Sequence, residues 1–127
     1  MLILCFISVK PFAPFLTVDK ADAVYESGTN LTFTCGSEVI YNFAYHTFLR
    51  DSKNISYQMI SDRSSKYQLT QSSPSDSGNY TCVVTTANGV SSDESLMVVI
   101  SVIGKNIMYI FSLWFELSKH EVSLAVV

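Results

Sequence analysis

Residues 76–82 of the chain read Asp76-Ser77-Gly78-Asn79-Tyr80-Thr81-Cys82. From Tyr80 onward the side chains alternate, and Tyr80, Cys82 and Val84 share one face of the segment. This alternation is typical of a strand with one face in a core. Residues 72–78 are rich in serine and contain proline and glycine, which indicates a turn. The stretch therefore predicts a turn followed by a half-buried strand with a cysteine on its apolar face.

The rest of the middle of the chain repeats this pattern. In residues 30–35, Leu31, Phe33 and Cys35 alternate with threonines. Turn-forming residues recur at the spacing of roughly 8–12 residues that is typical of β-sandwiches and barrels. Residues 96–100 form a continuous apolar run, which predicts a last strand covered on both sides. No stretch sustains the apolar stripe of a helix, so an all-β fold is predicted.

Composition divides the chain into three parts. The sequence is 48% hydrophobic and only 15% charged, below the roughly 25% charge of ordinary domains. The hydrophobic excess lies in residues 1–11 and 103–127, whereas residues 12–102 have an ordinary composition. We therefore expect one domain at 12–102, followed by an apolar tail at 103–127 that is not part of it. A net charge of -3 leaves no broad basic surface, so nucleic acid is not an expected partner.

The two ends each allow two interpretations. Residues 1–11 are either a degenerate signal or leader segment or a first apolar strand. Residues 107–117 are strongly apolar, but a membrane helix needs about 20 residues. A span over residues 96–117 would place Lys105 near the middle of the bilayer at a cost of about 2.5–3.5 kcal/mol. A tail outside the domain is the favoured interpretation, and membrane attachment stays open.

The three cysteines are Cys5, Cys35 and Cys82. Taken alone, the last two are either a disulfide between strands or two separate buried thiols. The motif Asp-x-Gly-x-Tyr-x-Cys at 76–82 resembles the signature of the immunoglobulin superfamily around its second cysteine. Residues 28–35 are similar to the strand that carries the first cysteine of that family. The resemblance extends over about residues 12–102.

This resemblance implies a fold and several residue roles. The fold would be an immunoglobulin-like two-sheet sandwich, C2- or I-like, with Greek-key topology. Cys35 and Cys82 would form the disulfide that joins the sheets. Asp76, Gly78 and Tyr80 would form the tyrosine corner, with the Tyr80 hydroxyl bonded to a backbone group.

The chain departs from the family pattern at one core position. Family members place a tryptophan against the disulfide, but the only tryptophan here is Trp114, outside the domain. Phe48 is expected to fill that place as the core aromatic. Residues 24–28 and 77–82 are similar to Fc-receptor-like proteins and platelet endothelial cell adhesion molecule, which favours a cell-surface receptor or adhesion protein.

Three sequons for N-linked glycosylation begin at Asn30, Asn54 and Asn79. The alternative is a chance set in a chain rich in serine and threonine. With Leu31 and Tyr80 facing inward, alternation turns Asn30 and Asn79 outward, where a glycan is tolerated. Together with the implied disulfide, the sequons predict an extracellular glycoprotein, either free or on the external side of the plasma membrane.

The sequence contains no recognisable catalytic motif, and no enzyme activity, cofactor or metal site is expected. Candidate partner-binding residues are Tyr41, Phe43 and Tyr45, which would lie opposite the inward Phe48 at the end of a loop and on an outer strand face. They would either bind a protein or cover a neighbouring domain. The turn at 87–89 is a second candidate surface.

These features predict an extracellular recognition module that binds a protein ligand or counter-receptor and takes part in cell adhesion or the immune response. A structural spacer without its own ligand and a secreted, truncated decoy are the alternatives. Proteins of this kind usually carry several such domains, so neighbouring immunoglobulin-like domains are expected in a full-length form.

Overall fold

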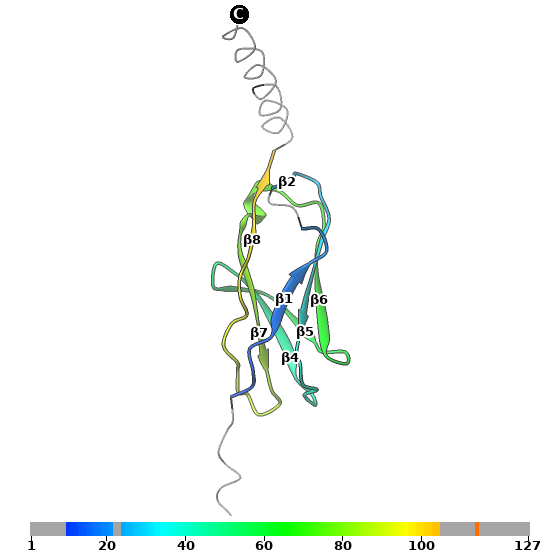
Figure 1. Ribbon diagram of the computed structural model, residues 1–127, viewed down its shortest axis with the longest axis vertical. Helices are drawn as coiled ribbons and strands as arrows, with labels where there is room; N and C mark the ends of the chain where they lie inside the picture. The colour runs from blue at the N-terminus through cyan, green and yellow to red at the C-terminus, as the bar shows by residue number, and fades with distance from the viewer. Residues whose placement is uncertain (1–9, 22–23, 105–113, 115–127) are drawn as a thin grey trace, which may run out of the picture.

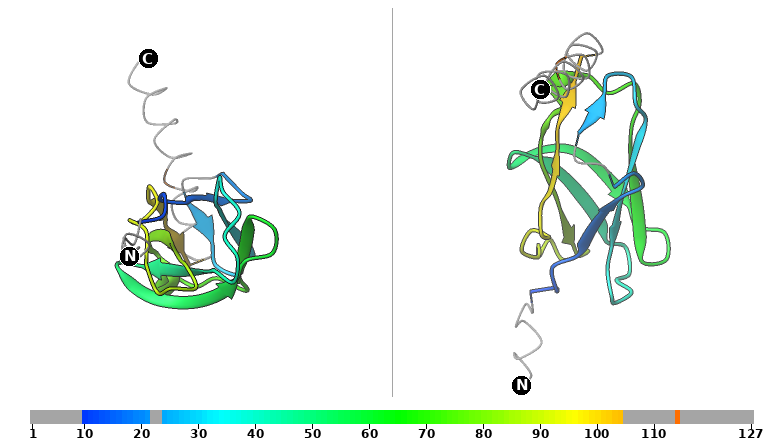
Figure 2. Two further views of the ribbon diagram at one scale, coloured as in Figure 1. Left: turned by 90° about the horizontal axis from the view of Figure 1, so that it is seen from below. Right: turned by 45° about the horizontal axis from the view of Figure 1, so that its top comes forward.

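The computed structural model describes residues 10–21, 24–104 and 114, and the continuous part of these residues forms a β-sandwich (Figures 1 and 2). Its strands are β1 (Phe15–Val18), β2 (Tyr25–Glu26), β3 (Leu31–Gly36), β4 (Tyr45–Arg50), β5 (Lys53–Met59), β6 (Ser64–Leu69), β7 (Gly78–Thr85), β8 (Val98–Ile100) and β9 (Val102–Ile103). One 3-10 turn, η2 (Pro74–Asp76), precedes β7.

The strands form two antiparallel sheets that pack face to face. One sheet has the order β1-β3-β6 and the other the order β5-β4-β7-β8. The chain crosses between the sheets after β3, β5 and β6, which gives the predicted Greek-key course. The short strands β2 and β9 pair in parallel. The predicted all-β sandwich is therefore confirmed.

A disulfide between Cys35 and Cys82 joins the centres of the two sheets, with the two Cα atoms 6.3 Å apart. The implied pairing is confirmed. Phe48 lies opposite Cys82 in the β4–β7 register and is buried against the core. Phe33 stacks on Tyr80 with ring centroids 4.5 Å apart. The core is thus built from the apolar positions of the alternating strands, with Phe48 beside the disulfide.

The β4–β5 hairpin turns at Asp51 and Ser52, whose φ angles are +51° and +66°. Two successive left-handed residues give the primed type of turn, whose twist matches that of the flanking strands. The Asp51 carboxylate accepts a hydrogen bond from the backbone N–H of Asn79 at 3.0 Å. This bond ties the hairpin to the start of β7.

The expectation for residues 96–100 is wrong. Only Val98–Ile100 form a strand, and Leu96, Met97 and Val99 are exposed, with 91% of Leu96 accessible. The Ser92 and Ser95 hydroxyls accept hydrogen bonds from the β7 backbone N–H groups of Val84 and Cys82, each at 3.0 Å. Side chains therefore replace part of the backbone ladder. Side chains alternate along β8, so that Ile100 is buried while Val99 faces solvent, and Leu96 and Met97 lie outside the strand.

The expectations for residues 1–11 and 103–127 fall mostly on residues outside the described part of the chain. Within it, Ile103 belongs to β9 and lies opposite Glu26 of β2. Across the residues that the structure describes, no helix has both the length and the apolar character to cross a bilayer.

Removing the disulfide is predicted to destabilise the domain strongly. The bond closes a loop with a sequence separation of 47, which corresponds to roughly 4 kcal/mol in the chain-entropy model. The double variant Cys35→Ala, Cys82→Ala should therefore lose about 2–5 kcal/mol of unfolding free energy in urea titrations. Wild-type protein under reducing conditions should show the same loss. A loss below about 1 kcal/mol would contradict the prediction.

Candidate functional site

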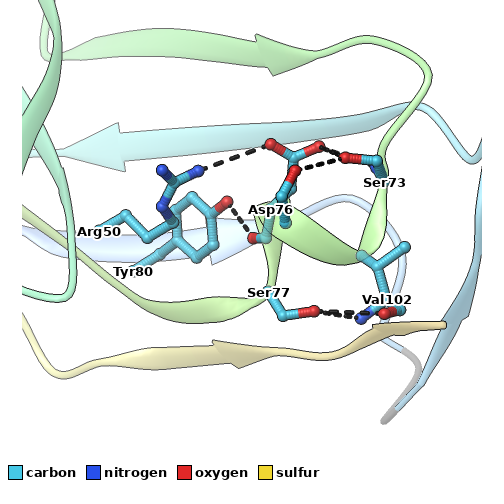
Figure 3. Close-up of polar contacts among 7 residues, drawn as sticks. Arg50, Ser73, Asp76, Ser77, Tyr80 and Val102 are labelled. Carbon is cyan, nitrogen blue, oxygen red and sulfur yellow. Dashed lines mark hydrogen bonds and ion pairs between the residues drawn. The ribbon is translucent and has the colours of Figure 1, made fainter.

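The turn before β7 holds a network of polar contacts around Asp76 (Figure 3). The Tyr80 hydroxyl donates a hydrogen bond to the Asp76 backbone carbonyl at 2.5 Å. Burial raises the pKa of Tyr80, so the hydroxyl stays protonated and remains a donor. The Asp76 carboxylate accepts from the Ser73 backbone N–H at 2.8 Å and lies 3.5 Å from the Arg50 guanidinium. The geometry is that of a tyrosine corner.

Two further contacts connect this corner to the adjoining strands. The Ser77 hydroxyl accepts from the Val102 backbone N–H at 2.9 Å and so holds β9 (Figure 3). Gly78 sits where a Cβ atom would lie 2.8 Å from an Asp51 carboxylate oxygen. Glycine at this position therefore allows the β4–β5 turn to approach the corner closely.

The three sequon asparagines are all exposed. Asn30 accepts a hydrogen bond from the Gln71 backbone N–H at 2.8 Å through its side-chain oxygen. Asn79 lies opposite Val99 of β8. Asn54 is the second residue of β5, and its side-chain amide donates a hydrogen bond to the Tyr57 hydroxyl at 2.8 Å. Their exposure is compatible with modification at each of the three positions.

The structure separates the three candidate binding aromatics. Tyr41 and Phe43 lie in the β3–β4 loop, residues 37–44, whereas Tyr45 begins β4. The Tyr45 ring contacts the Tyr57 ring edge-on, with centroids 6.1 Å apart, on the outer face of the four-stranded sheet. The Tyr41 hydroxyl accepts from the Phe12 backbone N–H at 3.4 Å. The trio thus belongs to two surfaces, a loop end and a sheet face.

The loop end is an exposed apolar surface, which we call the apolar tip. The apolar tip lies at the end of the sandwich where β1 begins, and the β7–β8 loop lies at the same end (Figures 1 and 2). β8 and β9 end at the opposite end of the sandwich. The exposed residues of the apolar tip are Phe12, Val39, Ile40 and Phe43. Tyr41, which lies between Ile40 and Phe43 in the sequence, is half-buried. The alternation pattern could not find Phe12 or Ile40, because both lie outside strands.

Phe43 stands out within the apolar tip. Its side chain is 84% exposed, and its backbone has a φ of +56°. A left-handed conformation is a genuine outlier for a bulky residue and costs of order 1–3 kcal/mol. The Phe43 ring is therefore exposed to solvent, and its residue has an energetically unfavourable backbone conformation.

The outer face of the four-stranded sheet carries a shallow hollow of about 250 Å³. Its lining mixes aromatic, aliphatic and hydroxyl side chains: Tyr45, Thr47, Leu49, Asn54, Tyr57, Val83, Thr85 and Ser91. The hollow extends from the start of β5 towards the apolar tip.

A buried histidine connects the two sheets on the inside. His46 of β4 contacts the Ser37 hydroxyl at 3.0 Å and the Ser65 hydroxyl at 2.6 Å through its two ring nitrogens. The ring is completely inaccessible, and this burial lowers its pKa to about 4. A serine beside a histidine suggests nucleophilic chemistry, but a substrate cannot reach this pair. Over the described residues, histidine, cysteine and carboxylate side chains form no group of three that would hold a metal ion.

Several solved structures resemble this sandwich. CHIR-AB1 superposes with a TM-score of 0.62 at 15% identity, over 72% of this chain and 98% of that one. The ligand-binding domain of human OSCAR gives 0.65 at 18% identity, over 74% of this chain and 51% of that one. The second Ig-C2 domain of human Fc-receptor like A gives 0.55 at 22% identity, over 72% and 98%.

The fold is immunoglobulin-like. Neither a protein-family model nor a curated protein sequence matches the chain. The sequence identities to the solved structures are low, so the comparisons define the fold of this immunoglobulin-like domain and leave its ligand to be inferred from its own surface.

The tyrosine corner should contribute measurably to the stability of the immunoglobulin-like domain. Tyr80→Phe keeps the ring on Phe33 but removes the hydrogen bond to Asp76, which should cost about 1 kcal/mol in chemical denaturation. Tyr67→Phe, in the ring cluster with Phe33 and Phe48, is the matched control and should change stability by less than about 0.5 kcal/mol. Equal effects of the two variants would contradict the assignment.

Stability should fall as the pH is lowered from 7 to 5. The unfolded His46 binds a proton near its usual pKa of 6.5, whereas the folded residue binds one only near pH 4. The unfolded state therefore holds more protons in this window, and about 2 kcal/mol should be lost by pH 5. His46→Gln should flatten this part of the profile. An unchanged slope in the variant would show that another group is responsible.

Proposed function

We propose that this chain is an extracellular recognition module of a cell-surface receptor or adhesion protein. It binds a protein ligand or counter-receptor through the apolar tip and performs no chemistry. The exposed Phe43 on a left-handed backbone is the observation that carries this proposal.

Exposed aromatic anchors supply much of the binding energy in protein interfaces. Phe12, Ile40 and Phe43 present such side chains at one end of a rigid sandwich, where loops of this fold class carry recognition. The Phe43 ring is almost entirely in solvent, so contacts of the ring within the domain do little to offset the backbone cost. An unfavourable backbone conformation at an exposed residue is expected where the side chain binds a partner protein.

The fold and the sequons support an extracellular setting. Immunoglobulin-like domains with a disulfide between the sheets suit oxidising compartments, and the human OSCAR domain of the same fold binds a ligand. A spacer domain is the competing function, because the apolar tip would then pack against a preceding domain of a longer protein. In both functions another protein surface covers the apolar tip. The experiment must therefore distinguish a separate protein ligand from a preceding domain of the same protein.

Phe43→Gly should separate stability from binding. Glycine adopts a φ of +56° without steric cost, so the variant should gain about 1 kcal/mol of unfolding free energy. The same change removes the anchor and should weaken binding of a multimeric, C-terminally tagged full chain to ligand-bearing cells by roughly tenfold or more. Flow cytometry across a panel of leukocyte and endothelial cell lines measures this.

Gln71→Gly is the matched control for this test. Gln71 is exposed and has a φ of +51°, but it lies before η2, at the opposite end of the sandwich. It should gain similar stability without any loss of binding. Binding that survives in Phe43→Gly contradicts the role of the tip. Absence of binding to every cell line, with both variants simply more stable, favours the spacer.

A further inference from the structure

The side chain of Asn54 and the ring of Tyr57 lie on the same face of β5, although they are three residues apart. In a regular strand such residues face opposite sides. The register of β4 and β5 shifts between Phe48 and Leu49, so that Ile55 is an extra, inward residue. This bulge turns both Asn54 and Tyr57 to the outer face, where the Asn54 amide donates to the Tyr57 hydroxyl at 2.8 Å.

The neighbours of this pair form a surface suited to a sugar. Tyr57 is 62% exposed, and its orientation is fixed by the edge contact with Tyr45. Thr47 lies beside it in register but is only 7% exposed, and at the far side of the hollow the buried Thr85 hydroxyl lies 2.8 Å from the hydroxyl of the exposed Ser91. The exposed Tyr57 ring offers apolar contact to the C–H side of a pyranose, and the exposed Ser91 hydroxyl can form a hydrogen bond to the sugar.

We propose that Asn54 carries an N-linked glycan whose first N-acetylglucosamine lies on the Tyr57 ring and whose core covers the hollow on the outer sheet face. The glycan is transferred from a lipid-pyrophosphate oligosaccharide by an oligosaccharyltransferase of the secretory pathway. A bond forms between the Asn54 amide nitrogen and the anomeric carbon of the sugar, that nitrogen loses one proton, and the lipid pyrophosphate leaves. The amide nitrogen keeps one hydrogen, which can still be donated to the Tyr57 hydroxyl.

The other two sequons differ in their surroundings and serve as internal comparisons. The Asn30 side chain is engaged with the Gln71 backbone, and Asn79 lies beside the aliphatic Val99. Among the described residues, neither side chain forms the hydrogen bond to a tyrosine that Asn54 makes with Tyr57. The inference does not depend on the partner of the apolar tip, because the glycan covers a different surface.

The first test uses the full chain secreted from mammalian cells. Glycopeptide mass spectrometry should find Asn54 occupied. Nitration of Tyr57 by tetranitromethane, followed by peptide mapping, should be slower in the wild type than in Asn54→Gln. The matched control Asn79→Gln removes a different glycan and should leave Tyr57 as protected as in the wild type. An unoccupied Asn54 overturns the proposal, as does equal nitration of Tyr57 in the wild type and Asn54→Gln.

A second test measures whether the sugar and the ring act together. Thermal unfolding of the glycosylated chain should give a Tm about 4 °C above that of Asn54→Gln. In a Tyr57→Ala background this difference should disappear, whereas the effect of Asn79→Gln should be the same with and without Tyr57. If the Asn54→Gln difference persists without Tyr57, the sugar does not rest on the ring.

Discussion

The disulfide between Cys35 and Cys82 is the constraint on which the rest of the structure depends. It holds β3 and β7, the central strands of the two sheets, at a fixed separation. In each strand the residue next to the cysteine faces away from the core, and the residue two positions away faces into it. Phe33 and Tyr80, each two positions before a cysteine, therefore meet in the core, where their rings stack. Once the two strands are aligned, the neighbouring strands have one register that buries their apolar faces.

The same alignment places the polar groups of the interior. Tyr80 continues from the core to the turn at Asp76, so that a single side chain belongs to both the apolar centre and the corner. His46 crosses between the sheets in the layer beside the disulfide, where two serines satisfy both ring nitrogens. Buried polar groups that are paired in this way stabilise one arrangement of the sheets over others, because any shift would leave them unpaired.

The buried residues stabilise the fold, so only the outer surface can bind a partner. Two regions of that surface differ in structure and composition. The apolar tip is built from loops and holds Phe43 in solvent against its backbone preference. The outer sheet face is built from regular strands and presents Tyr57 next to a sequon asparagine. A protein that is covered by its own glycan on the sheet face would meet a partner end-on. The two proposals therefore describe one molecule without competing for the same residues.

The sequence by itself determined the strands around both cysteines, since these follow from local alternation. The disulfide and the tyrosine corner were expected only because the motif at 76–82 resembles the signature of the immunoglobulin superfamily. Tertiary structure decided the rest. The run at 96–100 is mostly exposed because Leu96 and Met97 lie before β8 and Val99 faces away from the core. The bulge at Ile55 places Asn54 and Tyr57 on the same face of β5. Phe12 is far from residues 39–43 in the sequence but lies beside Tyr41 in the apolar tip. Each of these outcomes depends on which strand pairs with which and in what register, and that is fixed only when the two sheets pack together.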